Sequence, residues 1–239
     1  MRGTLIAGLQ KTTTIDFPGK LACTVFTRGC NFRCPYCHNS TLVLDEKNKD
    51  DISKDEFIAF LKKRKGVLDG VCISGGEPLM HENLIDLIIK IKEMGYLVKL
   101  DTNGSFPKKL RDLISKGLID YVAMDIKNSP ENYVKAIGLN YVDIKNINES
   151  IELLKTNQVP FEFRTTAVKG IHDIEDFASI SRWIQGEQQY YIQNYENSGD
   201  TIASRVKISQ ELESFTKNEL ESFLEVLKVK VPNACIRYA

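Results

Sequence analysis

The sequence lacks an excess of charge of either sign. Its 239 residues include 32 Lys and Arg against 32 Asp and Glu, which gives a formal net charge of zero. A nucleic-acid-binding protein usually carries a basic excess that neutralises phosphates. We therefore expect no nucleic acid among the partners.

Long hydrophobic runs are also absent. The apolar stretch Leu84–Ile91 is interrupted by Asp86 and Lys90 and falls far short of the about 20 residues that span a bilayer. The N-terminal apolar patch Leu5–Leu9 is shorter than the ~7–15-residue core of a secretory signal. We expect a cytoplasmic protein without membrane contact, in which thiols stay reduced.

The six cysteines, in a reducing compartment, indicate metal binding or simple burial rather than a disulfide framework. No low-complexity tract, internal repeat or linker rich in Pro, Gly and Ser divides the chain. We expect one domain over residues 1–239, with a core at about 20–195 and a C-terminal helical extension at about 209–239.

Short apolar β-rich runs alternate with amphipathic helical stretches, which is typical of parallel βα units. The alternation leaves open a doubly wound sheet or a curved, partly closed barrel. In both, ligand sites lie at the carboxyl ends of the strands. Ser53, with Glu56 three residues later, predicts a capping box at the first helix. Strands are predicted at 21–27, 70–74, 96–100, 121–124, 161–165 and 190–193, and helices at 54–64, 82–94, 108–116, 146–155, 174–184 and 211–227.

Three cysteines, Cys30, Cys34 and Cys37, form a C-x3-C-x2-C pattern just after the first predicted strand. Turn-forming residues surround them, so the loop can wrap three thiolates around one small object. A structural zinc ion prefers four ligands, and His38, next to Cys37, would have to supply the fourth. A four-iron cluster held by three cysteines leaves one iron free to bind a substrate or cofactor.

Polar motifs follow the next predicted strands. Ser74–Pro78 (SGGEP) follows the second strand, and its two glycines permit positive φ and a close approach of the backbone to a ligand. Asp101–Gly104 (DTNG) follows the third strand, Asp125–Lys127 (DIK) follows the fourth, and Arg164 lies in the fifth. An inward-facing arginine requires an anionic or carbonyl partner, since a buried unpaired charge is costly. Taken singly, these residues also fit turns, helix caps or surface salt bridges; their shared position favours one site.

The cysteine loop, with Tyr36 before its last cysteine, resembles the signature of the radical S-adenosylmethionine superfamily. The resemblance implies a partial (β/α)6 barrel of parallel strands with outer helices. It implies that Cys30, Cys34 and Cys37 bind a [4Fe-4S] cluster, whose fourth iron is chelated by the amino and carboxylate groups of S-adenosylmethionine. It also places the backbone near Tyr36 against the adenine.

The motifs DFPGK (residues 16–20), GGEP, DTNG and MDIK, in this order, resemble the glycyl radical enzyme activases and, within them, the anaerobic ribonucleoside-triphosphate reductase activating protein family. In the superfamily, GGEP holds the amino group of the cofactor, which implies this role for Glu77 with Gly75 and Gly76. The resemblance covers the chain from Leu9 to about Glu196, and no second cysteine-rich insert for auxiliary clusters is present.

In the activases, the acids of DTNG and DIK help form a monovalent-cation site beside the cofactor carboxylate, and the lysine contacts the cofactor. The resemblance therefore implies a cation near Asp101, Thr102 and Asp125, and a cofactor contact by Lys127. Arg164 would contact the ribose or a partner chain.

The implied activity is reductive cleavage of S-adenosylmethionine to a 5′-deoxyadenosyl radical, which removes hydrogen from a glycine of a partner glycyl radical enzyme. The implied partners are that enzyme, with anaerobic ribonucleotide reductase as the favoured candidate, and a flavodoxin- or ferredoxin-type electron donor.

Several further residues receive weaker interpretations. Thr166 and Val168 share a strand face with Arg164, and His172 lies in the next loop, where a surface or core role is also open. Gln193 and Tyr195 end the sixth predicted strand and would face the adenine. Cys23 and Cys72 read as core residues and Trp183 as a packing residue, while Cys235 has no assigned role.

Two other functions remain open. A radical S-adenosylmethionine enzyme of this length could convert a small molecule or modify a peptide. A zinc-stabilised interaction protein would use the same cysteines without any catalysis.

Overall fold

The computed structural model describes residues 6–44, 51–197, 199–206 and 211–238. Within them, one eight-stranded sheet runs in the order β1 to β8. β1 pairs antiparallel with β2, and every later neighbouring pair is parallel. The strands are β1 (Ile6–Thr13), β2 (Ala22–Thr27), β3 (Gly70–Gly75), β4 (Leu97–Thr102), β5 (Tyr121–Asp125), β6 (Phe161–Ala167), β7 (Gln189–Asn194) and β8 (Ala234–Arg237).

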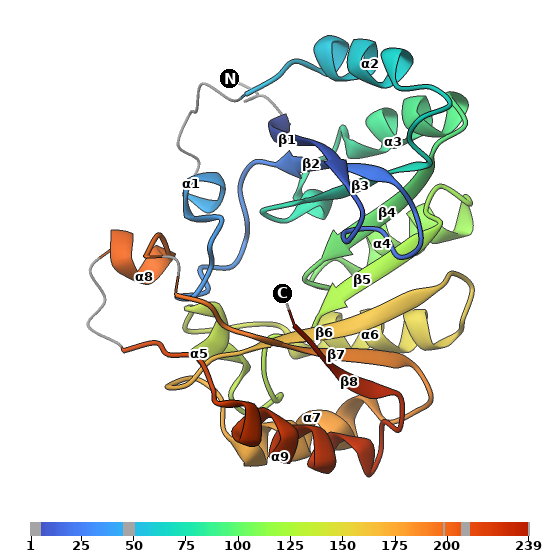
Figure 1. Ribbon diagram of the computed structural model, residues 1–239. Helices are drawn as coiled ribbons and strands as arrows, with labels where there is room; N and C mark the ends of the chain where they lie inside the picture. The colour runs from blue at the N-terminus through green and yellow to red at the C-terminus, as the bar shows by residue number, and fades with distance from the viewer. Residues whose placement is uncertain (1–5, 45–50, 198, 207–210, 239) are drawn as a thin grey trace.

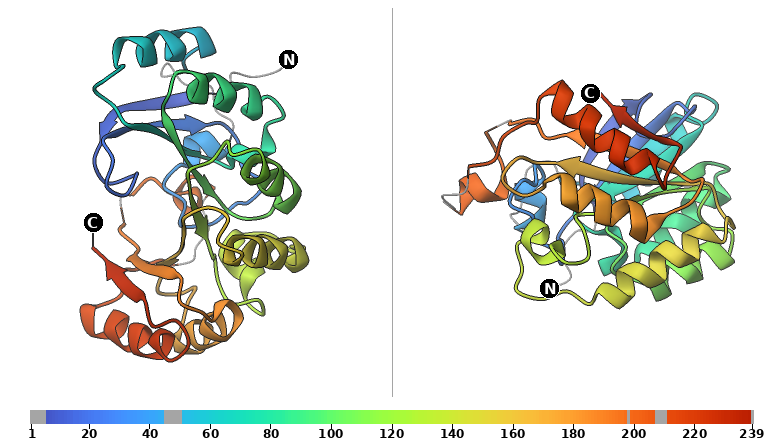
Figure 2. Two further views of the ribbon diagram at one scale, coloured as in Figure 1. Left: turned by 90° about the vertical axis from the view of Figure 1, so that its right-hand side faces the viewer. Right: turned by 90° about the horizontal axis from the view of Figure 1, so that it is seen from below.

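The sheet curves into an open barrel with helices along its outer side (Figures 1 and 2). β1 and β8 are its edge strands and do not pair with each other in the described ranges. This confirms the predicted partial barrel, with two strands more than expected. The helices are α1 (Ser40–Val43), α2 (Lys54–Lys63), the 3-10 turn η1 (Pro78–Met80), α3 (Leu84–Glu93), α4 (Pro107–Ser115), α5 (Tyr133–Ile137), α6 (Ile144–Lys155), α7 (Ile174–Ile184), α8 (Ile202–Arg205) and α9 (Lys217–Lys228).

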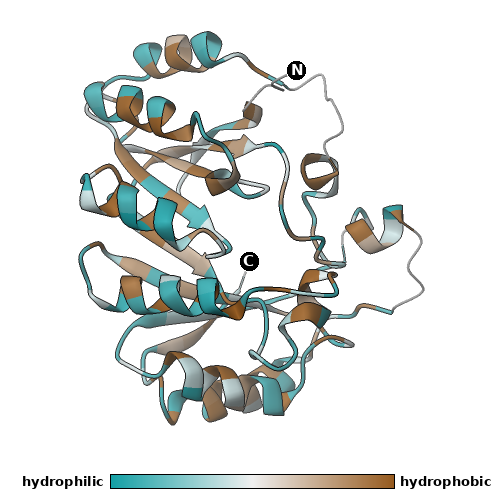
Figure 3. Ribbon diagram, turned by 180° about the vertical axis from the view of Figure 1, so that it is seen from behind, coloured by the Kyte–Doolittle hydropathy of each residue, from teal (hydrophilic) through white to brown (hydrophobic). Residues whose placement is uncertain are grey.

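Strand alternation separates an apolar outer layer from a polar interior. On β4, Val98 and Leu100 are fully buried in the hydrophobic core, which the apolar faces of the outer helices complete (Figure 3). Successive side chains point to opposite faces of a strand, so Lys99 and Asp101 face the inside of the barrel. Cys23 and Cys72 are fully buried, as predicted. None of the helices in the described ranges has the length and apolar character needed to cross a membrane.

The register of the parallel strands aligns their carboxyl ends along one rim of the barrel. Thr27 lies opposite Gly75, and Thr102 lies opposite Met124. Asp125 lies opposite Arg164 on the next strand. Polar residues that are far apart in the sequence therefore meet at this rim.

All six predicted strands and all six predicted helices are present, with ends shifted by a few residues. The predicted capping box of Ser53 and Glu56 is formed. The last helix begins at Lys217 rather than at Glu211, because the side chain of Thr216 caps its N-terminus and forms a capping box with Glu219. Residues 209, 210 and 239, which belong to the predicted C-terminal extension, lie outside the described residues.

The two edge strands were not predicted, and both have weak signals. The second half of β1 is polar, and Gln10, Lys11 and Thr12 are exposed, as is common for an edge strand. β8 has only four residues. The segment expected to form a helical extension therefore also contributes a strand to the sheet.

The C-terminal segment packs closely on the barrel. Phe223 of α9 stacks on Phe177 of α7 with ring centroids 4.5 Å apart, and it meets Phe215 edge to face at 4.8 Å. β8 pairs with β7 from Tyr190–Ala234 to Gln193–Arg237. These contacts make α9 and β8 part of the same packed body as the preceding strands.

Replacing Phe223 with alanine tests this integration. We expect the Phe223→Ala variant to lose about 3–5 kcal/mol of unfolding free energy, because a buried aromatic ring leaves a cavity. The measurement is urea unfolding followed by circular dichroism, with one transition and an unchanged m-value. The control is Val229→Ala, whose side chain is 75% exposed and which should change stability by less than about 0.5 kcal/mol. A main transition unaffected by Phe223→Ala would show that α9 is only loosely attached.

Candidate active site

The three cysteines of the C-x3-C-x2-C pattern lie on the loop between β2 and α1 and line one cavity of about 300 Å³. The opposite walls of this cavity are the carboxyl ends of β3 to β7. The predicted site residues that line it are Cys30, Cys34, Tyr36, Cys37, Gly75, Gly76, Asp101, Thr102, Asp125, Lys127 and Arg164.

Backbone hydrogen bonds from distant segments hold the cysteine loop in place. The Arg33 amide donates to the carbonyl of Ile137 at the end of α5 (2.8 Å). At the start of α8, the Ala203 amide donates to the carbonyl of Pro35 (2.9 Å), and the Ile202 amide donates to that of Cys37 (3.3 Å). Two short helices that the sequence did not predict therefore fix the positions of the thiols.

The donor set of the loop fits a metal cluster. Burial raises the pKa of the Cys30 thiol to about 11 and that of Cys34 to about 12, and it also raises the pKa of Cys37. Such thiols become thiolates when a bound metal replaces the proton. Among the described residues, no group of three or more His, Cys, Asp or Glu converges on a single metal ion. The three thiols share a cavity of about 300 Å³ with the strand ends, which has space for a group larger than one metal ion.

Another feature of the cysteine loop is the buried hydroxyl group of Tyr36. Its side chain is 5% exposed, and its hydroxyl has no hydrogen-bond partner among the described residues. The hydroxyl of the fully buried Tyr133 shares this property. Buried polar groups are nearly always satisfied, but both hydroxyls are enclosed by protein, so by themselves they do not mark a ligand in the cavity.

The two glycines of the SGGEP motif allow a close backbone contact with the cysteine loop. Gly75 has a φ of +115°, and a Cβ on it would lie 2.3 Å from the backbone nitrogen of Thr27. A Cβ on Gly76 would lie 1.7 Å from the carbonyl oxygen of Gly29. The sequence suggested that these glycines let the backbone approach a ligand, whereas their tightest approach is to the loop that carries the thiols.

Glu77 is the predicted site residue that does not line the cavity. It is fully buried, and its carboxylate accepts hydrogen bonds from the Asn103 amide (2.7 Å), the Thr102 hydroxyl (2.8 Å) and the Leu79 amide (3.1 Å). Its backbone amide donates to Gly29 at 2.8 Å. Glu77 therefore joins the ends of β3 and β4 to the cysteine loop.

Charged side chains form a connected row near the carboxyl ends of β4, β5 and β6. The guanidinium of Arg164 donates to Asp125 (2.9 Å) and lies 3.5 Å from Asp101. Asp101 also pairs with Lys99, and Asp125 pairs with Lys127 at 2.8 Å. Three cationic side chains thus contact two carboxylates, so this group of side chains has one positive charge in excess.

These pairs decide the charge state of the cavity wall. Burial alone would raise the pKa of both carboxyls, but Lys99 and Arg164 outweigh it at Asp101, and Arg164 and Lys127 outweigh it at Asp125. Both pKa values are therefore held below their usual range. Burial would lower the pKa of Lys127, but Asp125 outweighs it and holds that pKa well above normal. Asp101, Asp125 and Lys127 are therefore charged at neutral pH.

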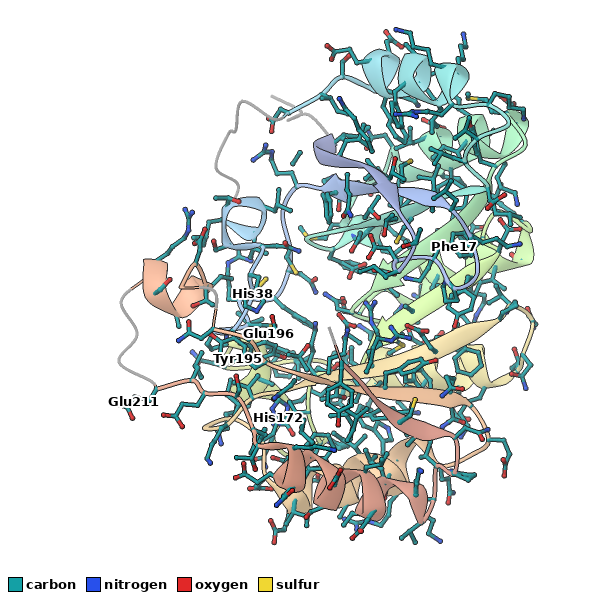
Figure 4. All side chains as sticks on the ribbon, in the orientation of Figure 1. Phe17, His38, His172, Tyr195, Glu196 and Glu211 are labelled. Atoms are coloured by element: carbon teal, nitrogen blue, oxygen red, sulfur yellow. The ribbon has the colours of Figure 1, made fainter. Side chains whose placement is uncertain are left out.

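The weaker sequence interpretations divide into two groups. Thr166 and Gln193 line the cavity. Val168 is buried in the core, and His172 packs behind the wall, with its Nε2 2.8 Å from the carbonyl of Lys127. Tyr195 stacks on His38 with ring centroids 5.5 Å apart (Figure 4).

Sequence reasoning missed several lining residues, of which two asparagines have clear roles. The Asn39 amide donates to the carbonyl of Gly75 (3.0 Å). The Asn103 side chain donates to Asn31 in the cysteine loop (2.9 Å). In the sequence, these asparagines could be recognised only by their position beside or within a motif: Asn103, for example, lies within DTNG. The other missed lining residues are Phe32 and Val43, while His38, which the sequence suggested only as a zinc ligand, and Ser74 of the SGGEP motif also line the cavity.

Comparison with known proteins identifies the family. The Radical SAM superfamily model matches residues 24–184, a range that contains the cysteine loop and the rim residues of β3 to β6. The chain belongs to the radical SAM superfamily. Members of this superfamily use a [4Fe-4S] cluster and S-adenosylmethionine, and the thiols, the cavity and the charged wall described above fit both groups.

Curated relatives place the chain more narrowly. A protein of Methanocaldococcus jannaschii with the name "Putative glycyl-radical enzyme activating enzyme MJ1227" is 35% identical over 98% of this chain and 95% of its own length. The pyruvate formate-lyase-activating enzyme of Staphylococcus aureus is 29% identical over 70% of each chain. The chain therefore belongs to the family of glycyl-radical enzyme activating enzymes.

Solved structures agree on the fold. A domain of pyruvate-formate lyase-activating enzyme from Bacteroides vulgatus matches with a TM-score of 0.54 and 17% identity, over 70% of this chain and 98% of that one. Streptococcus suis SuiB, bound to its precursor peptide SuiA, matches with a TM-score of 0.64 and 16% identity, over 87% of this chain and 46% of that one. At these identities, the likeness concerns the fold alone.

The pH dependence of stability tests the burial of Glu77. Burial raises the pKa of Glu77 from 4.5 to about 7, although the hydrogen bonds from Asn103 and Thr102 act in the opposite direction. The folded state then holds this proton more tightly than the unfolded chain, so the stability that this group contributes falls as pH rises from about 4.5 to about 7.

The Glu77→Gln variant has no proton to lose at this position. Between about pH 4.5 and pH 7.5, we expect the wild-type protein to lose about 3 kcal/mol relative to the variant, at about 1.4 kcal/mol per pKa unit. Urea unfolding of both cluster-free proteins across this range measures the difference. A difference that stays constant with pH would contradict the buried, proton-retaining carboxyl.

Proposed function

We propose that this chain activates a glycyl radical enzyme by reductive cleavage of S-adenosylmethionine, and that its partner is anaerobic ribonucleotide reductase. One observation carries the chemistry: three thiols and a charged wall from three strand ends line a single cavity. The choice of partner is supported by the DFPGK segment and its order with the later motifs. The family membership of the chain supports the class of reaction.

Cys30, Cys34 and Cys37 would hold the [4Fe-4S] cluster. A cluster held there would supply the electron for reductive cleavage of S-adenosylmethionine between sulfur and the 5′ carbon, and the resulting 5′-deoxyadenosyl radical would take hydrogen from glycine. The protein itself would position the cluster and the cofactor and protect them from solvent. The amides of Arg33, Ile202 and Ala203 do not bind the cluster but fix the loop through carbonyl partners.

The charged wall would orient the cofactor. Lys127 and Arg164 carry fixed positive charges at the cavity, and the excess of one positive charge favours a carboxylate there. Asp101 and Asp125 keep these cations in place rather than binding ligand themselves. Gly75, Gly76 and the backbone near Tyr36 would contact the rest of the cofactor, and Glu77 would position Thr102 and Asn103.

The remaining partners follow from the chemistry. Reduction of the cluster requires a one-electron donor, and we propose a flavodoxin- or ferredoxin-type protein.

The six cysteines of the chain are compatible with a reducing compartment, which supports the expected cytoplasmic location. We propose that residues 1–239 act as one domain, because α9 and β8 pack on the barrel.

Electron paramagnetic resonance tests the function directly. The reconstituted protein, S-adenosylmethionine, a chemical reductant and anaerobic ribonucleotide reductase should together give a glycyl radical signal on the reductase. The Cys30→Ala, Cys34→Ala and Cys37→Ala variants should lose the signal, cofactor cleavage and the iron–sulfur absorbance near ~400 nm. Cys235→Ala is the matched control, since Cys235 lies on β8 outside the cavity.

The outcomes separate the alternatives. Cofactor cleavage by the wild-type protein without a glycyl radical on any candidate partner would contradict activation and favour a small-molecule or peptide substrate. A cysteine variant that keeps both absorbance and cleavage would overturn the cluster assignment.

Arg164 bears on the monovalent cation that the family resemblance implies near Asp101 and Asp125. We propose that its guanidinium neutralises both carboxylates in place of that cation. Cofactor cleavage by the wild-type protein should then change by less than about twofold when K⁺ and Na⁺ are replaced by tetramethylammonium. Arg164→Met should lower cleavage about tenfold or more, with partial rescue by added K⁺, because two buried carboxylates lose their shared cation. Strong dependence of the wild-type protein on K⁺ would instead indicate a cation bound beside Arg164.

A further inference from the structure

Among the residues that the structure describes, the outer edge of β1 has no pairing partner over its second half. β1 pairs with β2 on one side only. On the other side, the Ile52 amide donates to the carbonyl of Ile6 (3.2 Å), and within the described ranges no residue bridges to this edge from Leu9 to Thr12. An open edge presents unpaired amide and carbonyl groups that can pair with another extended chain.

Two hollows flank this open edge. The first, of about 570 Å³, lies between β1 and α1 and includes Leu9, Lys11 and Leu42 in its lining. The second, of about 690 Å³, lies between β1 and α2 and includes Phe60 and Lys63. Leu9, Lys11 and Ile52 line both hollows. We call the two hollows together the β1 groove.

The β1 groove continues into the cysteine-lined cavity. His38 and Asn39 line both that cavity and the first hollow. Figure 1 shows the same order in space, with α1 beside the open end of the barrel and α2 above β1. A path therefore leads from α2, along the edge of β1, to the three thiols.

An extended polypeptide fits this path better than a compact ligand. A strand added to a sheet edge bonds through its main chain and sends alternate side chains to the two faces of the sheet. Leu9 and Lys11 line both hollows of the β1 groove, so side chains of an added strand would find space beside these residues. Leu9, Leu42 and Phe60 offer apolar contacts.

The charged residues that line the β1 groove indicate the charge of the segment that docks there. Lys11, Lys63 and Arg64 line the part near α2, against one acid, Glu56. Three positive charges and one negative charge favour an acidic segment at that end. The end near the cavity must carry the glycine from which hydrogen is removed.

We propose that the glycine-bearing segment of the partner enzyme docks as an extended strand on the open edge of β1, with acidic residues near α2 and its glycine in the cysteine-lined cavity. The proposal rests on the proposed function, because it requires a polypeptide substrate. It adds an entry path and a charge preference that family membership does not provide.

Charge reversal at Lys11 tests the docking site. The rate of glycyl radical formation is measured against the concentration of anaerobic ribonucleotide reductase for the wild type, Lys11→Glu and Lys20→Glu. We expect Lys11→Glu to raise the half-saturating concentration about five- to tenfold, with a steeper loss at low salt. Lys20→Glu is the matched control, because Lys20 is exposed in the turn between β1 and β2 and lines neither hollow.

Hydrogen exchange tests the strand pairing itself. The amides in the Leu9–Thr12 segment of β1 that point away from β2 should exchange at least about tenfold more slowly when the reductase is added, since they enter new hydrogen bonds. Amides of β8, the other edge strand, should not change. Protection that appears without the reductase and grows with the concentration of this chain would mean that a second copy occupies the edge, and it would overturn the proposal.

The failures are distinguishable. If the wild-type protein forms no glycyl radical, the proposed function fails. If it does, but Lys11→Glu behaves like Lys20→Glu, or the protection appears on β8 instead of β1, the docking site is wrong while the function stands.

Discussion

The active-site cavity depends on one backbone contact, between the end of β3 and the cysteine loop. Gly76 approaches Gly29 so closely that a side chain has no space, and the Glu77 amide donates to the Gly29 carbonyl at 2.8 Å. The contact sets the height of the loop above the rim of the barrel. Together with the hydrogen bonds from α5 and α8, it holds the three thiols so that they face the strand ends across the cavity.

The same region couples the loop to the charged wall. The carboxylate of Glu77 binds the Thr102 hydroxyl and the Asn103 amide, and the Asn103 side chain reaches back to Asn31 in the loop. In the wall of the same cavity, Arg164 ties the ends of β4, β5 and β6 together through Asp101 and Asp125. A buried network in which each member is paired is rigid, so the cofactor would meet a preformed surface rather than one that must assemble.

Much of this arrangement could be predicted from the sequence. The six central strands and their helices have strong alternating and helical periodicity, and the cysteine loop and rim motifs have distinctive spacing. The edge strands β1 and β8 were missed, because exposed Gln10 and Lys11 weaken the apolar pattern of one and the other has four residues. The inward orientation of Glu77 was also missed. A motif shows which residues occur together, but the direction of a side chain depends on donors such as the Asn103 amide, which belong to another strand.

The account rests on a cluster held by three thiolates with one free iron. The most direct measurement is the iron, sulfide and zinc content of the anaerobically purified and reconstituted protein. The account predicts about four irons and four sulfides per chain, with one iron that shifts spectroscopically when S-adenosylmethionine is added. About one zinc per chain, with neither iron nor sulfide, would contradict it.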